Sequence, residues 1–294
     1  MITVVGSMNM DLVVGAPRFP KQGETILGDL FATAPGGKGA NQAVAAARLG
    51  GNVHMIGAVG NDAFGVELLT TLRGEGINTA GVSRTKGMSG IANILLTEGD
   101  NRIIVVPGAN HTIGPEQAEA FEQQLAASSI VIVQLEVPLD LVTRTLELCR
   151  SHQVPVILNP APAAEAARNL LALATYITPN ETEAEELFGP AWERALEEYP
   201  NRLIVTLGKA GARFFNGERH VSVKGFAAEV ADTTGAGDAF NGALGVALSE
   251  GMELREAIRF ANAAASLSVE KIGAQTGMPE WAAVVERLSQ GHSG

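Results

Sequence analysis

Residues 129–160, SIVIVQLEVPLDLVTRTLELCRSHQVPVILNP, contain a strand, a helix and a second strand in succession, and this unit decides the fold class. The apolar runs at 130–133 and 154–158 are rich in Val and Ile, as buried strands are, and the stretch between them has the spacing of an amphipathic helix. The same alternation recurs in the helical stretches 115–128, 163–174 and 181–189 and in the strands 175–180 and 202–208. Near-continuous apolar strands separated by helices indicate a parallel sheet covered by helices on both faces, so we predict an α/β fold.

The N-terminal part adds further strands and helices and two stretches of a different kind. Strands are expected at ITVVG (2–6) and VHMIGAVG (53–60), and helices at 39–50 and 63–76. The other two stretches contain short strands interrupted by Gly and Pro, without a helical period, and the second turns at EGDN (98–101). We therefore expect an α/β core made of residues 1–10, 36–88 and 111–294, and a small β-sheet lid made of residues 11–35 and 89–110.

Composition excludes several classes of protein. The chain has 294 residues, 46% of them hydrophobic, with a net charge of −11 and a pI of about 5.0. This acidity argues against a surface for nucleic acid or anionic membrane, both of which require a basic field. The single cysteine, Cys149, excludes a disulfide framework. No basic residue precedes Arg18 and no apolar run reaches about 18 residues, so we expect a soluble, cytoplasmic protein. The sequons at Asn110 and Asn180 are then chance matches.

Ligands of parallel sheets bind beyond the carboxyl ends of the strands. Polar or turn-forming residues follow the predicted strands at Asn9, Asp11, Glu136, Asn159, Asn180, Thr206 and Gly208. We expect these residues to lie near one another at one edge of the sheet.

The segment DTTGAGDAFNGAL (232–244) carries the clearest chemical signal. Its Gly235, Ala236 and Gly237 enter a helix, so their backbone N–H groups can converge on an anion. If the anion is a phosphoryl group in transfer, this hole stabilises the charge of the transition state. The neighbouring carboxylate, Asp238, can then accept the proton of an attacking hydroxyl. The alternative is that Asp238 is an ordinary helix N-cap.

Two further motifs carry polar groups suited to hydroxyl ligands. In GGKGANQAVAAARLG (36–50), Gly37 allows close approach of the backbone, and Lys38 and Asn41 can bind hydroxyls; the alternative is a structural glycine-rich turn. In GSMNMD (6–11), Asn9 and Asp11 suit vicinal hydroxyls, and the alternative is an Asx turn. The sequence lacks a complete P-loop, a dinucleotide fingerprint, a GxSxG elbow and histidines at metal-ligand spacing.

With these motifs, and with QLEVPL, NPAPA, TPNETEAEEL, TLGKAGA and AIRFANAAASLSVEKIGAQ, the chain resembles the ribokinase-like (PfkB-type) family of carbohydrate kinases along nearly its whole length. NPAPA, TPNETEAE and GAQ point to the ribose-phosphorylating members. The resemblance implies transfer of the ATP γ-phosphoryl group to the 5-hydroxyl of D-ribose, giving ribose 5-phosphate. It implies a sugar site of Asn9, Asp11, Gly37, Lys38, Asn41 and Glu136, with Asp238 as the general base and Gly235, Ala236 and Gly237 as the anion hole.

The resemblance also implies nucleotide and metal sites. For ATP it implies Asn180, Thr206, Gly208, Gly211, Gly237 and Asn262. It implies that Glu183 organises Mg²⁺ through water; the alternative there is a solvated acid. It implies a monovalent cation, usually K⁺, bound by the Asp232 side chain and the carbonyls of Thr234, Ser268, Lys271 and Gly273. The chain departs from the family pattern at Gly277, where a serine is common, at Asn262, where histidine is common, and in a shortened stretch before 202–208.

The acceptor and the oligomeric state remain open at this point. The same chemistry could act on deoxyribose, fructose, or a nucleoside such as adenosine or pseudouridine. A non-catalytic sugar-binding regulator is a remote alternative, because the base and the Gly-Ala-Gly are both intact. The lid strands would leave exposed edges and an apolar face, so we expect a homodimer through the lid.

Overall fold

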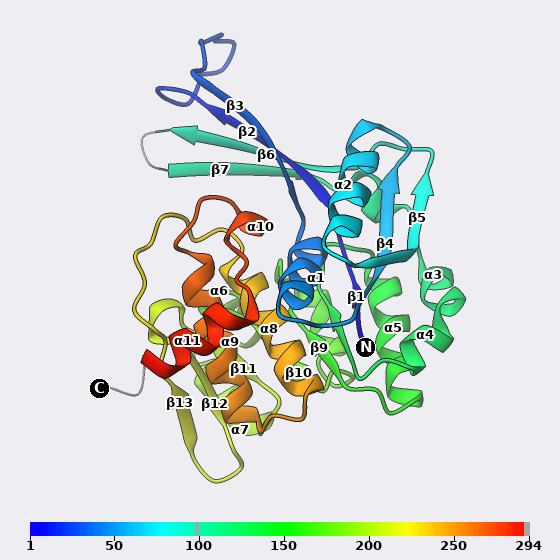
Figure 1. Cartoon of the computed structure of the whole chain (residues 1–294), viewed down its shortest axis with the longest axis vertical. Helices are drawn as coiled ribbons and strands as arrows, with labels where there is room; N and C mark the ends of the chain where they lie inside the picture. The colour runs from blue at the N-terminus through cyan, green and yellow to red at the C-terminus, as the bar shows by residue number, and fades with distance from the viewer. Residues whose placement is uncertain (98–99, 291–294) are drawn as a thin grey trace.

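The computed structural model describes residues 1–97 and 100–290. In these residues the predicted parallel sheet is present, with six strands in the order β10-β9-β8-β1-β4-β5, all parallel (Figure 1). The strands are β1 (Ile2–Val5), β4 (Val53–Gly60), β5 (Asn78–Thr85), β8 (Ile130–Val133), β9 (Val156–Leu158) and β10 (Tyr176–Ile177). The fold class expected from the strand–helix alternation is thereby confirmed.

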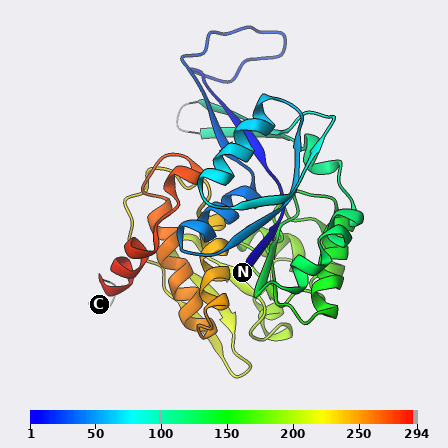
Figure 2. The same ribbon diagram turned by 45° about the vertical axis from the view of Figure 1, so that its right-hand side comes forward.

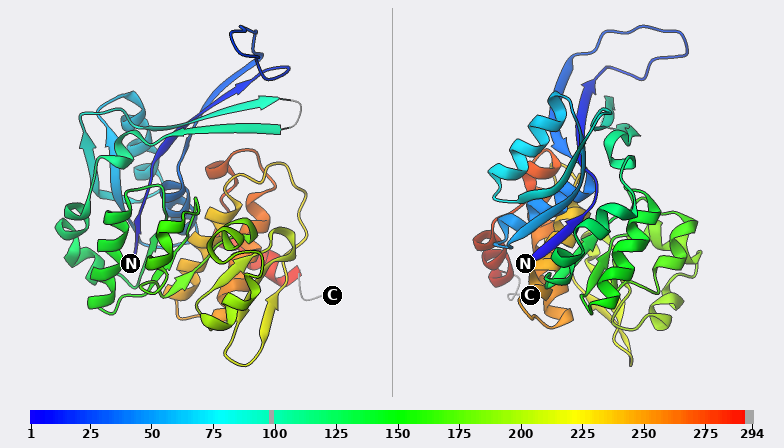
Figure 3. Two further views of the ribbon diagram at one scale, coloured as in Figure 1. Left: turned by 180° about the vertical axis from the view of Figure 1, so that it is seen from behind. Right: turned by 90° about the vertical axis from the view of Figure 1, so that its right-hand side faces the viewer.

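Helices cover both faces of this sheet because side chains along its strands alternate between the faces. In β8, Ile132 enters one apolar core and Val133 the other. The first core is covered by α1 (Lys38–Arg48), α2 (Ala63–Gly74), α8 (Ala236–Ser249), α9 (Leu254–Ser268) and α11 (Trp281–Gln290). The second is covered by α3 (Pro115–Ala120), α4 (Glu122–Ala126), α5 (Leu139–Ser151), α6 (Glu181–Phe188) and α7 (Glu193–Glu198). The right-hand view of Figure 3 shows these layers edge-on.

Two predicted helices differ from the sequence-based expectation. The stretch 115–128 is broken at Phe121, which has a φ of −113°, into α3 and α4. The stretch 163–174 forms a 3₁₀ helix, η2 (Glu165–Leu170), instead of an α-helix. Its buried residues Ala167 and Leu170 are three apart, and in a 3₁₀ helix residues at that spacing lie on one side, so this form buries both.

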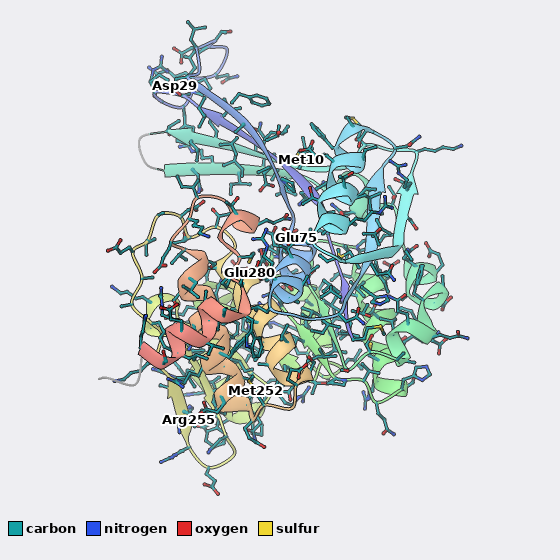
Figure 4. The ribbon with its side chains drawn as sticks, viewed as in Figure 1. Met10, Asp29, Glu75, Met252, Arg255 and Glu280 are labelled. Atoms are coloured by element: carbon teal, nitrogen blue, oxygen red, sulfur yellow. The ribbon has the colours of Figure 1, made fainter. Side chains whose placement is uncertain are left out.

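A second sheet projects beyond the carboxyl ends of the central strands (Figure 2). It has the order β3-β2-β6-β7 and comprises β2 (Asn9–Gly15), β3 (Leu30–Gly36), β6 (Gly90–Thr97) and β7 (Asp100–Val106). Figure 4 labels Met10 where β2 leaves the body and Asp29 at the far end. Residues 98 and 99 of the expected turn, and 291–294 of the expected core, lie outside the described residues. We call this second sheet the lid sheet.

The lid sheet exposes large apolar side chains. Phe31 is 69% exposed and Ile104 65% exposed, and Leu30, Ile103, Val105 and Val106 are also exposed. Exposed apolar patches of this kind mark surfaces that contact another molecule.

A third sheet extends the central one at the β10 edge. It comprises β11 (Ile204–Thr206), β12 (Ala212–Phe215) and β13 (His220–Val223), which pair antiparallel. Parallel bridges from Ile177 to Leu203 and from Asn180 to Thr206 join β11 to β10. Thr206 and Asn180 therefore lie side by side. The short helices η1 (Gly108–His111), η3 (Gly208–Ala210) and α10 (Ala274–Gly277) complete the described elements. Within the described ranges, no helix combines the length and apolarity needed to cross a membrane.

Candidate active site

The candidate site forms where α8 begins against α1. Gly235 caps α8 with a φ of 80°, and a Cβ there would lie 2.9 Å from the Cβ of Ala274, so glycine meets both requirements. About two turns later, a Cβ on Gly242 would lie 2.6 Å from the Cβ of Ala45 in α1. The missing side chain lets the two helices pack closely, which brings the first turn of α8, with Asp238, to the first turn of α1.

Both carboxylate oxygens of Asp238 accept hydrogen bonds from amide side chains of α1. Asn41 Nδ2 donates to Oδ2 at 2.9 Å, and Gln42 Nε2 donates to Oδ1 at 2.9 Å. Asp238 is only 7% exposed. The cap of α8 is Gly235, and Asp238 lies three residues further on, in the first turn. The alternative that Asp238 is an ordinary N-cap is therefore wrong.

Opposing effects act on the charges in this site. Burial raises the pKa of Asp238 above its ordinary value, although Lys38 and the two amide donors act in the opposite direction. Burial by itself lowers the pKa of Lys38, but the combined field of Asp238, Glu136 and Glu183 outweighs burial and raises it. Lys38 is therefore a fixed positive charge beside several carboxylates.

Asp11 and Glu136 approach the same place from β2 and from the segment after β8. Burial, followed by the negative charges of Glu136 and Asp238, raises the pKa of Asp11 to about 7. Glu136 Oε2 accepts a hydrogen bond from the backbone N–H of Lys38 at 3.1 Å and another from the Ser7 hydroxyl at 2.5 Å. Glu136 thus ties the start of α1 to the carboxyl edge of the sheet.

Asn9 lies on β2 and is held by Asn110. Asn110 Nδ2 donates to Asn9 Oδ1 at 2.8 Å, and Asn110 also bonds the backbone N–H and carbonyl of Met8. Because Asn9 belongs to an extended strand and its oxygen accepts from Asn110, the Asx-turn alternative is wrong. Gly37 is the N-cap of α1, so the glycine-rich motif is a structural turn placed at the site.

A cavity of about 160 Å³ opens at the first turn of α8. It is lined by Lys38, Asn159, Ala161, Thr178, Asn180, Glu183, Thr206, Thr233, Gly235, Ala236, Gly237, Asp238 and Asn241. Asn180 and Glu183 form a capping box at the start of α6, since each side chain bonds the backbone N–H of the other at 2.8–2.9 Å. Glu183 is half-buried, and burial raises its pKa. Its role in organising Mg²⁺ and the alternative of a solvated acid both stay predictions.

A larger crevice, of about 490 Å³, lies between the β12–β13 hairpin and the start of α9. Figure 4 labels one of its residues, Arg255, near the end of the molecule opposite Asp29 and the lid sheet. The smaller cavity is the better candidate site because the predicted base, the Gly-Ala-Gly segment and part of the predicted nucleotide site line it. The other residues expected at the sugar site lie outside this lining: Asn9, Asp11, Gly37, Asn41 and Glu136.

Other residues implied for the nucleotide lie outside the cavity lining. Gly208 begins η3, and a Cβ on Gly211 would lie 2.1 Å from the Val223 carbonyl oxygen. Asn262 Nδ2 donates to the carbonyls of Val223 and Lys224 at 3.0 and 3.2 Å. Asn262 thus anchors the chain that leaves β13, beside the Gly208–Gly211 turn.

The residues implied for a monovalent cation also gather. Asp232 accepts from the backbone N–H groups of Thr234 and Gly273, both at 2.9 Å. Burial raises the pKa of Asp232, but these bonds and that of the Thr234 hydroxyl outweigh it and lower the pKa. The Ser268 carbonyl lies against Gly277, where a Cβ would be 2.2 Å from its oxygen. A serine at 277 would therefore require the backbone to move. Lys271 is exposed in the loop between Ser268 and Gly273.

Arg48 joins α10 to the rest of this region. Its guanidinium pairs with the two carboxylate oxygens of Glu75, which Figure 4 labels, at 3.0 and 2.6 Å. Its remaining Nη1 donates to the carbonyls of Gln275 and Met278 at 2.7 and 3.1 Å. The ion pair holds in place the segment that packs against Gly235.

Several buried amides of this site do not follow from the motifs alone. Gln42, Gln134 and Gln275 are buried and contact Asp238 or Asn41 directly or through one another. Gln42 lies on the same helix face as the buried residues Ala45, Ala46 and Leu49. A polar residue on an apolar helix face is a signal from which the buried position of Gln42 could have been predicted. Asn110, whose sequon we interpret as a chance match, has its side chain fully engaged inside the protein.

Comparisons with known proteins show the family to which this chain belongs. The pfkB family carbohydrate kinase model matches residues 1–281. The chain belongs to the pfkB family of carbohydrate kinases. It is 49% identical to the ribokinase of Bacillus subtilis, over 98% of this chain and 99% of that protein. It is 44% identical to the ribokinase of Lactococcus lactis, over 98% and 97%. The structure of Arabidopsis thaliana ribokinase complexed with ribose and ATP matches with a TM-score of 0.90 and 35% identity, over 98% of each chain.

Membership of the pfkB family confirms the family that the sequence motifs indicate and the kinase activity that they imply. This chain is a ribokinase-like sugar kinase.

Proposed function

We propose that this kinase transfers the γ-phosphoryl group of ATP to the 5-hydroxyl of D-ribose. The observation that carries the proposal is the buried Asp238 carboxylate, held by two amide donors beside the N–H groups that open α8. The ribokinases of Bacillus subtilis and Lactococcus lactis support ribose as the acceptor, as does the Arabidopsis relative, whose structure is complexed with ribose and ATP.

The sugar would bind where the lid sheet meets the body. Asp11 and Asn9 on β2, with Lys38 and Asn41 on α1, present acceptors and donors to hydroxyl groups from two sides. Glu136 lies on the third side, bonded to the Lys38 backbone. Gly37 places the α1 backbone beside them.

Asp238 would act as the general base. As the 5-oxygen attacks the γ-phosphorus, the O–H proton passes to Asp238, the new O–P bond forms, and the bond to the β-phosphate oxygen breaks to release ADP. The N–H groups of Gly235, Ala236 and Gly237 would stabilise the charge on the transferring phosphoryl oxygens. Burial raises the pKa of Asp238, which makes the carboxylate a better proton acceptor.

The nucleotide would lie between Gly237 and the Asn180–Thr206 edge of the cavity, with Gly208, Gly211 and Asn262 beside it. Glu183 lines the same cavity and would hold Mg²⁺ through water. Mg²⁺ supplies charge neutralisation for the phosphates when bound. An ATP-dependent reaction also supports a cytoplasmic location.

The oxygen groups around Asp232 fit a monovalent cation such as K⁺, since a carboxylate and carbonyl oxygens suit a hard cation. We assign this site to Asp232 and to the carbonyls of Thr234, Ser268, Lys271 and Gly273. A bound cation would add positive charge behind the anion hole. Gly277 has no side-chain oxygen to take the place of the family serine, and water could supply the ligand there.

We also propose a homodimer through the lid sheet. Its exposed Phe31 and Ile104, which the strand register places on one face of the sheet, would be buried, and pairing would cover an exposed strand edge. A lid over the sugar site would exclude water, which could otherwise accept the phosphoryl group.

The test is ADP release from Mg·ATP with ribose, deoxyribose, fructose, adenosine and pseudouridine, each with and without K⁺. We expect ribose to give the highest kcat/KM. Asp238→Asn should lower turnover roughly 10²–10⁴-fold while leaving ATP binding intact, and Asp140→Asn, an exposed acid in α5, is the matched control. A strong preference for another acceptor would overturn ribose as substrate, and normal turnover by Asp238→Asn would overturn the base.

A further inference from the structure

The two amides that bond Asp238 are themselves oriented by two more buried amides. Gln134 Nε2 donates to Gln42 Oε1 at 2.6 Å. Gln275 Nε2 donates to Asn41 Oδ1 at 3.2 Å. In each pair, the outer amide occupies the oxygen of the inner one, so the NH₂ group of the inner amide faces the Asp238 carboxylate.

Gln42 has a further reason to keep this orientation. Its Nε2 also donates to Asn159 Oδ1 at 3.1 Å, so both N–H groups are used, one on Asn159 and one on Asp238. If the amide were reversed, Oε1 would face two acceptor oxygens, and its NH₂ group would face the NH₂ group of Gln134. Both contacts would be repulsive, and buried polar groups without partners are costly.

The orientation of Gln134 is fixed in turn by the central sheet. Gln134 is completely buried at the end of β8, and its Oε1 points at Gly6 at the end of β1, where a Cβ would lie only 1.9 Å away. In the described part of the chain this oxygen has no hydrogen-bond partner. Within the described residues, the Gln134 side chain is thus bonded to Gln42 through its Nε2 alone.

We propose that Gln42 and Gln134 are positioning residues for the reaction, acting through Asp238. Gln42 holds the carboxylate in its ionised form and in one rotamer, and Gln134 holds Gln42 so that it donates. Hydrogen bonds to the charged form of an acid lower its pKa, which opposes the effect of burial. Burial and the charge of Glu136 raise the pKa of Asp238, while the charge of Lys38 and the two amide donors lower it, so the amides contribute to the pH above which the base is active. This inference rests on the proposed role of Asp238 as base.

The test compares Gln42→Met and Gln134→Met with a matched control, Gln117→Met. Gln117 is also a buried glutamine with both ends bonded, to the Gly81 carbonyl and the Ser83 hydroxyl, but it lies on α3, away from Asp238. All three variants remove a buried amide of similar volume, so loss of stability affects them alike.

The readout is the pH dependence of kcat with ribose and Mg·ATP. We expect Gln42→Met to move the acid limb upward by about one pH unit, because a hydrogen bond to a charged group is worth that much or more. Gln134→Met should move it in the same direction by a smaller amount, and Gln117→Met should leave it in place. An unchanged limb in Gln42→Met, with normal wild-type activity, would overturn the inference while leaving the proposed function standing.

A second measurement needs no substrate. The difference in Tm between Asp238→Asn and its parent, followed against pH, reports the titration of Asp238 itself. In the Gln42→Met background this titration should move to higher pH. If wild type phosphorylated no acceptor, the proposed function would fail, yet this measurement would still decide whether Gln42 affects the charge of Asp238. A titration that stays at the same pH in the Gln42→Met background would refute that effect.

Discussion

Asp11→Asn is expected to make the protein more stable, and more so at pH 8 than at pH 5. Asp11 has a pKa of about 7 in the folded protein, against 3.8 for the unperturbed group, because burial and the charges of Glu136 and Asp238 disfavour its ionised form. A raised pKa contributes stability that is fully present below pH 3.8 and is lost as the pH rises through about 7. Asparagine resembles the protonated acid and does not titrate, so it avoids this loss.

The magnitude follows from the two pKa values. Moving a pKa from 3.8 to about 7 corresponds to at most roughly 4 kcal/mol at pH 8, of which roughly 3 kcal/mol develops between pH 5 and pH 8. For a chain of 294 residues, about 3 kcal/mol corresponds to roughly 4–5 °C in Tm.

The assay is thermal unfolding of wild type and Asp11→Asn without ligands, at pH 5 and pH 8. The gain in Tm should be several degrees larger at pH 8. Asp140→Asn, at an exposed site, controls for the general loss of a negative charge. An equal gain in Tm at both pH values would show that the surroundings of Asp11 do not disfavour its ionised form. In the same variant, ribose binding should be weaker at pH 8, because an ionised carboxylate is the stronger acceptor for hydroxyls.

Three other predictions concern packing, assembly and the cation. Gly242→Ala should lower the free energy of unfolding by about 1–3 kcal/mol because the new Cβ meets Ala45. Gly74→Ala, in open space at the end of α2, should be neutral or stabilising. Chemical denaturation measures both variants, and equal effects would contradict the close packing of α8 on α1. The double variant Phe31→Asp/Ile104→Asp should sediment as a monomer, whereas Val66→Asp, at an exposed site on α2, should leave the dimer intact. A dimer that survives the double substitution would place the interface elsewhere. Arg48→Met should raise the K⁺ concentration needed for half-maximal activity, since it releases the carbonyls of Gln275 and Met278. Arg144→Met, which removes a surface ion pair, should leave that concentration unchanged. An unchanged K⁺ titration in Arg48→Met would show that Arg48 does not support the cation site.

Local patterns along the chain are enough to predict the fold class and the chemical groups of the candidate site. The period of apolar residues in 129–160 distinguishes buried strands from a surface helix, because the strand buries consecutive residues and the helix buries one face. The Gly-Ala-Gly before Asp238 specifies a helix entry with open N–H groups, since that chemistry is local to the segment. Local signals of this kind need no knowledge of what lies opposite in space.

The surroundings of those groups depend on contacts between elements that are far apart in the chain. From the motif alone, Asp238 could be a helix cap. The packing of Gly242 on Ala45 places α1 beside it, and its partners Asn41 and Gln42 are almost two hundred residues away in the sequence. The elevated pKa of Asp11 depends on burial and on charges from the segment after β8 and from α8. The amides of Gln134 and Gln275 have no local pattern, because their role lies in which oxygen each one faces. Distances between elements decide such properties, and those distances follow from how the helices and strands pack together.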